Sequence, residues 1–283
     1  MPGLSTQQLA SYERDGFLVI EDFAGREECE RLKRRAEALV RDFDPRGVTS
    51  IFSTREQTRA SDDYFLDSGD KVRFFFEEDA FAPDGGLLYA KERSINKIGH
   101  ALHDLDPVFD AFSRKPELAA ICADLGYAEP LLLQSMYIFK QPGIGGEVTC
   151  HQDATFLYTE PLSVAGFWFA LEDATQENGC MWVIPGGHKL GLKKRFVRAA
   201  EVGQGEMIFE TLDDSPWPDT AQAPLEVSQG ALILLHGLLP HLSHANRSAK
   251  SRHAYTLHVI DGACEYGNDN WLRRAPDMPL RGF

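Results

Sequence analysis

The sequence predicts a mainly β fold of the α+β type: a β-sandwich or jelly roll with helices packed outside it. Short apolar runs recur through the second half between Gly, Pro and Asn residues, which is typical of antiparallel β domains. Helical patterns are concentrated before residue 130, and we find none between successive runs, so a doubly wound parallel sheet is disfavoured. The runs are 131–140, 146–152, 164–171, 180–184, 207–209, 231–235 and 254–260.

The first 130 residues are expected to be mostly helical. Ser5 and Gln8 form a capping-box pattern, which predicts that a helix begins there. Apolar residues at helical spacing, or alternating and β-branched ones, define the elements that follow. In order, these are a strand at 16–20, a helix at 26–41, a strand at 71–76, and helices at 95–105 and 116–125.

Composition limits the class of protein. The chain has 283 residues and no repeat, so we expect one domain over 1–283, with a jelly-roll core at 131–262. Its net charge of −14 argues against nucleic acid and anionic membrane as partners, because both need a basic surface. No apolar run is long enough to span a membrane. The five scattered cysteines and the lack of a secretory signal predict a cytoplasmic protein with no implied partner protein.

One short motif points to metal chemistry. His151 and Asp153 are two residues apart at the end of run 146–152. Alternation along a strand would turn both side chains to one face and Gln152 to the other. With a second histidine they form the two-histidine, one-carboxylate triad of non-haem Fe(II) oxygenases. On its own the motif is a weak signal, because His-x-Asp occurs by chance in many proteins.

The second histidine must come from the C-terminal part of the chain. The candidates are His236, His241, His244, His253 and His258. Ser243 and Arg252 favour His241, and His236 is its rival. An arginine fork suits the distal carboxylate of 2-oxoglutarate, a serine hydroxyl can add a bond, and the small residues at 254 and 256 leave room for a ligand. Without the histidines, Arg252 would be typical of a surface residue at the start of a strand.

Four segments together resemble the phytanoyl-CoA dioxygenase family. The first combines His-x-Asp at 151–153 with the segment 241–252, which begins with the distal histidine and ends with an arginine eleven positions later. The second is Asn-Gly…Ile-Pro-Gly-Gly-His-Lys at 178–189, with Gly187 where the family usually has serine. The segments 94–103 and 134–142 resemble the subgroup called phytanoyl-CoA dioxygenase domain-containing protein 1. The likeness runs from Gly16 to Trp271.

The resemblance implies a double-stranded β-helix, the cupin-like jelly roll, with flanking N-terminal helices. It also implies an iron site and a cosubstrate site. Their residues would be His151, Asp153 and His241 for iron, Arg252 and Ser243 for the 2-oxoglutarate tail, and Lys97, Met136 and Trp168 along the cosubstrate. Without the resemblance, that lysine would be interpreted as solvated and the methionine and tryptophan as core residues.

The implied activity is a dioxygenase that uses Fe(II), 2-oxoglutarate and O2 to hydroxylate a small molecule, releasing succinate and CO2. The presence of Asp153 favours this over halogenation, because halogenating relatives lack the carboxylate. Two alternatives stay open. One is a metal-dependent, non-redox enzyme of the cupin kind, and the other is a sensor that binds 2-oxoglutarate without turnover.

Two further segments bear on the substrate. Basic residues follow the Pro-Gly-Gly turn and could receive an anionic substrate at the pocket rim, although a solvated loop is the simpler interpretation. These are Lys189, Lys193, Lys194, Arg195 and Arg198. The polar segment 44–70 is expected to be either a lid or an ordinary surface loop.

Overall fold

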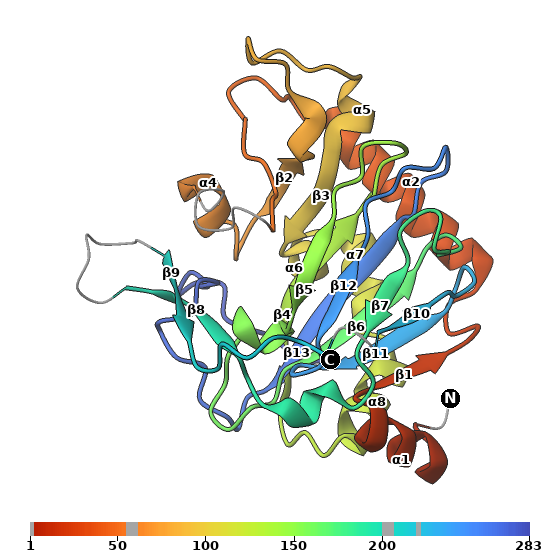
Figure 1. Cartoon of the computed structure of the whole chain (residues 1–283), viewed down its shortest axis with the longest axis vertical. Coiled ribbons are helices and arrows are strands. Elements are labelled where there is room, and N and C mark those ends of the chain that lie inside the picture. Colours follow the sequence, from red (N-terminus) through yellow and green to blue (C-terminus); the bar gives the residue numbers. More distant parts are fainter. Residues whose placement is uncertain (1–2, 55–61, 200–206, 219–221) are drawn as a thin grey trace.

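A computed structural model describes residues 3–54, 62–199, 207–218 and 222–283, and Figure 1 shows its course. The helices are α1 (Thr6–Asp15), α2 (Arg26–Asp42), α4 (Asp63–Leu66), α5 (Lys91–Ser94), α6 (Leu102–Leu105), α7 (Pro107–Ser113) and α8 (Pro116–Asp124). The strands are β1 (Phe17–Ile20), β2 (Val72–Phe76), β3 (Ile95–His100), β4 (Pro130–Ile138), β5 (Val148–His151), β6 (Ala165–Ala170), β7 (Met181–Val183), β8 (Lys194–Arg198), β9 (Met207–Thr211), β10 (Ala223–Leu225), β11 (Leu232–His236), β12 (His241–Ser243) and β13 (Ala254–Asp261).

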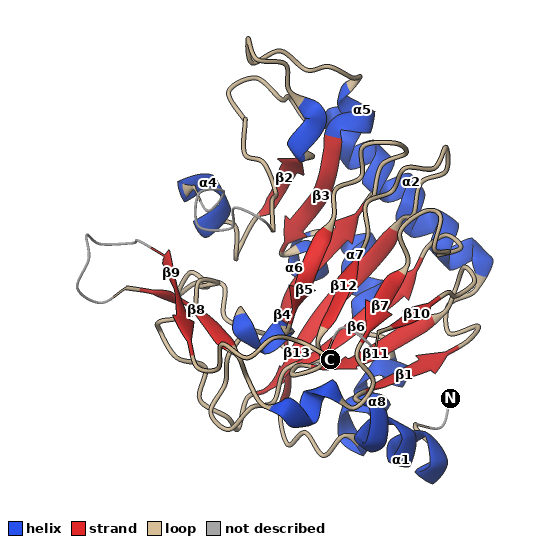
Figure 2. Cartoon of the chain, in the orientation of Figure 1, coloured by secondary structure: helices blue, strands red, loops and turns tan. Residues whose placement is uncertain are grey.

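Two antiparallel sheets form the centre of the molecule. The larger has seven strands in the order β1-β11-β6-β13-β4-β3-β2, and the smaller has four in the order β10-β7-β12-β5. Figure 2 shows the smaller sheet in front of the larger one. Side chains from both fill the space between them, including Trp168, Val183 and Ile233. The predicted jelly roll is therefore confirmed, and each of the seven apolar runs of the second half overlaps a strand.

Strands from the N-terminal part complete the larger sheet. The predicted strands at 16–20 and 71–76 are β1 and β2, and β1 pairs with β11 at one edge. The sheet therefore extends beyond the segment 131–262 that was expected to form the core. The predicted capping box is also present, since the backbone nitrogen of Gln8 donates to the Ser5 hydroxyl at 3.2 Å and the reciprocal bond is 2.9 Å.

The predicted helix at 95–105 is wrong for most of its length. Residues Ile95–His100 form strand β3, which lies between β2 and β4, and only Leu102–Leu105 is helical. Ile95 and Ile98 have helical spacing, but all six residues of β3 are buried, with a sheet neighbour on each side. Pairing in the sheet outweighs the local periodicity here. The predicted helices at 26–41 and 116–125 are confirmed as α2 and α8.

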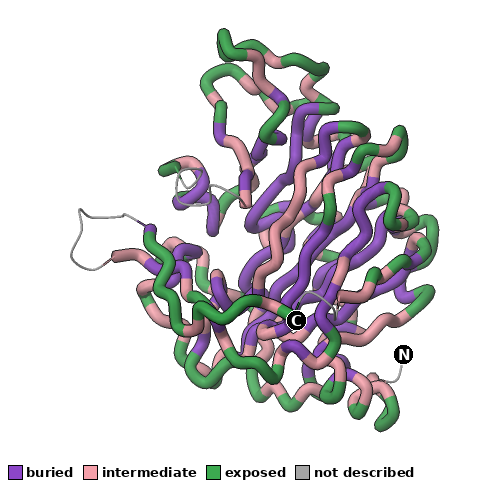
Figure 3. The backbone as a smooth tube through the Cα atoms, viewed as in Figure 1, coloured by how far each residue is buried: buried purple, intermediate pink, exposed green. Residues whose placement is uncertain are grey.

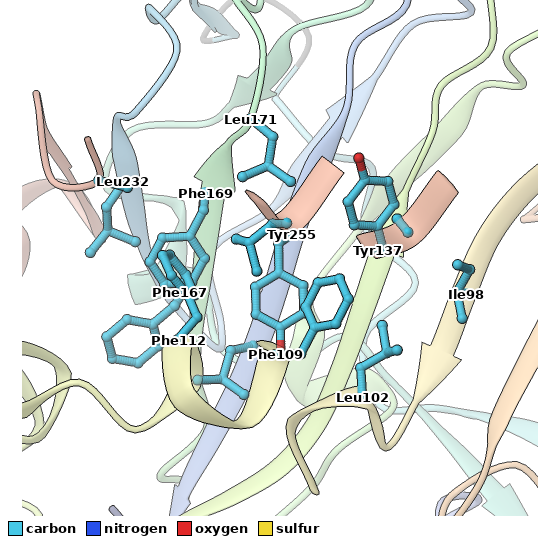
Figure 4. Packing of buried hydrophobic residues seen from close by; sticks show 14 of the residues in the cluster. Ile98, Leu102, Phe109, Phe112, Tyr137, Phe167, Phe169, Leu171, Leu232 and Tyr255 are labelled. Carbon is cyan, nitrogen blue, oxygen red and sulfur yellow. The ribbon is translucent and has the colours of Figure 1, made fainter. Parts of the chain in front are cut away.

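Helices cover the face of the large sheet that is turned away from the small one. Figure 4 shows aromatic residues of α7 packed on the sheet. Phe109 lies 5.0 Å from Tyr255 between ring centroids, and Phe112 lies 5.0 Å from Phe169 in an edge-on arrangement. Such contacts add to the free energy gained by burial. This helical layer leaves the opposite face of the sheet, toward β5 and β12, to build the site.

Burial follows the same arrangement. Figure 3 shows the central strands buried along their length, and every residue of β6 and β13 is buried. No helix among the described residues is long and apolar enough to cross a bilayer. Of the segment 44–70, residues 55–61 lie outside the described residues, so the lid hypothesis is not tested there.

Candidate metal centre and adjoining pockets

The three predicted ligands meet at one end of the small sheet, where its edge strand β5 pairs with β12. His151 is the last residue of β5 and pairs directly with His241, the first residue of β12. Asp153 follows two residues later, at the start of a 3-10 turn. Its Oδ1 lies 3.8 Å from His151 Nε2 and 3.7 Å from His241 Nε2. One ligand atom from each of the three falls within 4.8 Å of the others, a spacing that suits one metal ion.

Backbone carbonyls orient both imidazoles for metal binding. Nδ1 of His151 donates to the Thr149 carbonyl at 2.8 Å, and Nδ1 of His241 donates to the Leu239 carbonyl at 3.0 Å. Each ring therefore carries its hydrogen on Nδ1 and presents a free Nε2 lone pair, the usual arrangement behind a metal ligand. Burial and the neighbouring His241 lower the pKa of His151 to about 4, so its ring is neutral at pH 7.

Gln152 shows that the alternation argument holds. Its side chain turns away from the triad and donates to the carbonyls of Gly191 and Leu238, both at 2.8 Å.

His236, the rival ligand, accepts a bond from the Leu238 backbone nitrogen through Nδ1 at 3.0 Å. Among the described residues, the only metal-ligating group found is the triad with His241, and His236 lies outside it.

The carboxylate of Asp153 is held by its surroundings. Burial alone would raise the pKa of Asp153, but the nearby His258, His241 and His151 bring it below its usual value. His258 approaches the outer oxygen, Oδ2, with Nε2 at 3.3 Å. Below that oxygen lies Gly166, where a Cβ atom would stand only 2.8 Å from Oδ2. A side chain at 166 would therefore displace the carboxylate.

A cavity of about 590 Å³ opens on the triad. His151 and Asp153 line it, and so do Lys97 and Met136, two of the residues assigned to the cosubstrate by resemblance. Lys97 is buried, with Nζ 3.6 Å from the Met136 sulfur and 3.5 Å from the centre of the Phe52 ring. Burial lowers the pKa of Lys97 well below its ordinary value.

The other predicted cosubstrate residues form a second, deeper cluster. Arg252 is 3% exposed, and its guanidinium lies 5.2 Å from the centre of the Trp168 ring. Its Nε donates to the Gly179 carbonyl at 3.1 Å, whereas its buried Nη1 has no hydrogen-bond partner among the described residues. The two clusters are joined along one sheet face, because Thr256 pairs with both Trp168 and Met136.

Sequence reasoning missed Lys140, which completes the deeper cluster. This lysine is 1% exposed and donates to the Ser243 hydroxyl at 2.9 Å and to the Gly146 carbonyl at 2.6 Å. Burial and then the nearby Arg252 lower its pKa to about 7. Lys140 ends the apolar run 131–140, and a lysine there is usually solvated. No local pattern could have placed it beside Arg252.

The basic cluster after the Pro-Gly-Gly turn is dispersed. Lys189 donates to the Arg14 carbonyl, Arg195 pairs with Asp269, and Arg198 donates to the Trp271 carbonyl. Only two of its members line the cavity, and these are Lys193 and Lys194. Lys193 forms an ion pair with Asp213, with 2.6 Å between Nζ and Oδ2. The described mouth of the cavity therefore does not concentrate positive charge.

The fold and the triad define a metal-binding jelly-roll protein, and comparison with known proteins gives its family. The family model described as Phytanoyl-CoA dioxygenase (PhyH) matches residues 12–254. A phytanoyl-CoA dioxygenase of Arabidopsis thaliana is 48% identical over 276 residues, covering 96% of this chain and 94% of the relative. Phytanoyl-CoA dioxygenase domain-containing protein 1 of Mus musculus is 46% identical over 288 residues, covering 99% and 98%.

The chain belongs to the phytanoyl-CoA dioxygenase family, as the sequence segments predicted. Among solved structures, the epimerase SnoN in complex with Fe3+, α-ketoglutarate and nogalamycin RO aligns with a TM-score of 0.65 at 15% identity. The alignment covers 98% of this chain and 92% of that one. At this identity the likeness supports the shared fold alone.

Proposed function

We propose that the protein is a non-haem oxygenase that uses Fe(II), 2-oxoglutarate and O2 to oxidise a small molecule, with hydroxylation as the expected outcome. The observation that carries the proposal is the triad of His151, Asp153 and His241. Two imidazoles and one carboxylate converge there from β5, β12 and the turn after β5. This is the ligand set of the 2-His-1-carboxylate oxygenases, which leaves positions open on the metal.

The residues present fit both a metal and an acidic cosubstrate. Asp153 Oδ2 and Arg252 Nη1 are buried and have no hydrogen-bond partner among the described residues. A buried polar atom left without a partner costs roughly 1–3 kcal/mol, and more when it is charged. Arg252 Nη1 would gain a partner from the distal carboxylate of the cosubstrate. Asp153 Oδ1, which lies 3.8 Å from His151 Nε2 and 3.7 Å from His241 Nε2, would face the cation.

Each cosubstrate residue has a proposed role. Arg252 binds the distal carboxylate through Nη1 and is held flat by Trp168. Ser243 adds a hydrogen bond from the same side, with Lys140 fixing its hydroxyl oxygen. Lys97 and Met136 line the cavity that contains His151 and Asp153, where they would contact the rest of the cosubstrate. Acidic ligands that lack a second carboxylate would leave Arg252 unpaired, so the site favours a dicarboxylate.

Bound Fe(II) and 2-oxoglutarate would allow O2 to oxidise the small molecule, with succinate and CO2 as the products of the cosubstrate. The chain supplies orientation and a dry site. His151 and His241 are held in one tautomer by carbonyls, and Gly166 leaves room for the Asp153 carboxylate. SnoN, an epimerase of the same fold, was solved in complex with Fe3+ and α-ketoglutarate.

The test is formation of succinate from 2-oxoglutarate by the purified chain. With Fe(II) and O2 we expect slow succinate release even without a primary substrate, and its loss when a chelator is added. A protein that binds 2-oxoglutarate calorimetrically but forms no succinate would be a sensor. One that binds metal but not 2-oxoglutarate would favour the non-redox cupin alternative, in which the buried charge of Arg252 is unexplained.

A further inference from the structure

The cavity contains one imidazole that the proposed iron and cosubstrate sites do not use. His100, the last residue of β3, is fully buried and lines the cavity together with His151 and Asp153. Its ring is enclosed by aromatic rings, with Trp271 at 5.1 Å, Phe75 at 5.3 Å and Phe65 at 5.5 Å between centroids. Its Nε2 atom is buried and has no hydrogen-bond partner among the described residues.

The surrounding bonds fix which nitrogen of His100 carries the hydrogen. The Ser68 hydroxyl oxygen lies 2.5 Å from the Phe65 carbonyl, and two oxygens at that distance need the hydroxyl hydrogen between them. Ser68 Oγ is therefore an acceptor toward His100 Nδ1, 2.6 Å away. The hydrogen of the neutral ring lies on Nδ1, and Nε2 holds a bare lone pair.

This ring is neutral, and no group in the described part of the chain donates to its Nε2. Burial, with the nearby Lys97 and His258, lowers the pKa of His100 well below its ordinary value. Lys97 is not a donor to Nε2, which has no hydrogen-bond partner among the described residues, and its amine contacts the Met136 sulfur at 3.6 Å. An unmade hydrogen bond in a closed aromatic enclosure is unfavourable unless water or a ligand supplies the hydrogen.

Two more polar groups accompany His100 in the cavity. His258 on β13 faces Asp153 through Nε2, and its buried Nδ1 has no partner among the described residues. Gln134 is directly opposite His258 on β4 and also lines the cavity. Together they place hydrogen-bonding groups beside the triad on a largely apolar wall that includes Phe65 and Trp271. Such a wall orients an apolar molecule by a few polar contacts.

We propose that His100 is the specificity-determining residue for the primary substrate, and that Nε2 accepts a hydrogen bond from a hydroxyl group of an otherwise apolar molecule. The assignment of this hydroxyl to a substrate rests on the oxygenase function proposed above. A carboxylate or an ether oxygen at the same place has no hydrogen to donate, so its lone pairs would repel the lone pair of Nε2. The site therefore selects an alcohol over the matching acid or ether.

The test uses three probes of one shape: indan-2-ol, 2-methoxyindane and indane. Each is titrated calorimetrically into the full chain loaded with Fe(II) and 2-oxoglutarate, without O2. We expect indan-2-ol to bind about fivefold more tightly than the ether, the effect of one hydrogen bond between neutral groups. Equal affinities for the alcohol and the ether, or no binding of the alcohol, would overturn the proposal.

Variants identify the residue responsible. His100→Phe keeps a ring in the enclosure and removes the acceptor, so the alcohol-to-ether ratio should fall to about one. His236→Phe is the matched control, because it replaces a histidine that does not line this cavity, and its ratio should stay at the wild-type value. A His100→Phe protein that keeps the fivefold ratio would refute the role of His100.

A second variant keeps the test decisive if His100→Phe does not fold. Ser68→Ala removes the oxygen that holds the hydrogen on Nδ1, so both tautomers become populated and the ratio should fall at least twofold. Nitrogen-15 NMR of the protein loaded with Zn(II) should show Nε2 without hydrogen in the wild type, and a protonated Nε2 would overturn the proposal. The probes bind without turnover. Lost succinate formation with an intact ratio would therefore count against the oxygenase function and not against this site.

Discussion

Replacing Arg252 should separate the binding of 2-oxoglutarate from the binding of the metal. Arg252→Ala removes a guanidinium that is 3% exposed, stacked over Trp168 and left with an unpartnered Nη1. Truncating one partner of a buried, hydrogen-bonded charge pair costs roughly 2–5 kcal/mol, or on the order of 30-fold to several-thousand-fold in affinity. The lysine next to it cannot compensate, because Lys140 already donates to Ser243 and Gly146. We expect the affinity for 2-oxoglutarate to fall by that factor.

The assay is an anaerobic calorimetric titration with Fe(II) first and 2-oxoglutarate second. Iron affinity should be nearly unchanged, since Arg252 is not one of the metal-ligating residues. Arg252→Lys should rescue only part of the loss, because an ammonium cannot form the two-pronged contact of a guanidinium. Arg247→Ala is the matched control, as this arginine is exposed and donates only to the Gly143 carbonyl. Wild-type affinity for 2-oxoglutarate in Arg252→Ala would show that the cosubstrate binds elsewhere.

Three further predictions concern the same sites. Gly166→Ala should weaken Fe(II) binding by about tenfold or more, since its Cβ would lie 2.8 Å from Asp153 Oδ2. Gly25→Ala is the control and should leave Fe(II) affinity unchanged, since its Cβ would have no neighbouring atom nearer than 4.0 Å. Equal Fe(II) affinities of the two variants in a calorimetric titration would refute this. Burial lowers the pKa of Lys140 to about 7 in the folded protein. Between pH 7 and the ordinary pKa of lysine, the unfolded chain therefore binds more protons than the folded protein, and the free energy of unfolding should rise with pH. In urea melts Lys140→Met should lose that rise, by up to ~1.4 kcal/mol per pH unit, and an unchanged slope would contradict the assignment. Metal with 2-oxoglutarate should raise Tm beyond metal alone, since a ligand at a hundredfold excess over Kd stabilises by about 2.7 kcal/mol; no added shift at millimolar 2-oxoglutarate would favour the cupin alternative.

The sequence predicted the elements whose pattern is local. Apolar runs between turn residues locate the strands of the second half, and a capping box locates the start of α1. Strand β3 was mistaken for a helix because Ile95 and Ile98 have helical spacing, and only its neighbours β2 and β4 show that both faces are covered. Strands β8, β10 and β12 were not predicted, since none of them lies in one of the apolar runs.

The site shows the same division. His151 and Asp153 could be paired from sequence because alternation on one strand brings them together. His241 could be chosen only with the help of Ser243 and Arg252, which lie further along the chain. Lys140 and His100 could not be found, because their roles depend on burial beside residues far away in sequence: Ser243 for the lysine, and Ser68 for the histidine. From sequence alone, a lysine and a histidine are usually interpreted as solvated residues, and only the assembled sheet shows that these two are buried.

The central claim is that His151, Asp153 and His241 hold an iron that consumes 2-oxoglutarate. The most direct measurement is succinate formed per O2 consumed by the wild type and by Asp153→Ala, each with Fe(II), with far-UV circular dichroism to show that the fold survives. Asp213→Ala is the control, since this carboxylate is at the mouth of the same cavity and pairs with Lys193. We predict succinate from the wild type and the control and none from Asp153→Ala. Wild-type succinate formation by Asp153→Ala would contradict the assignment of the metal centre.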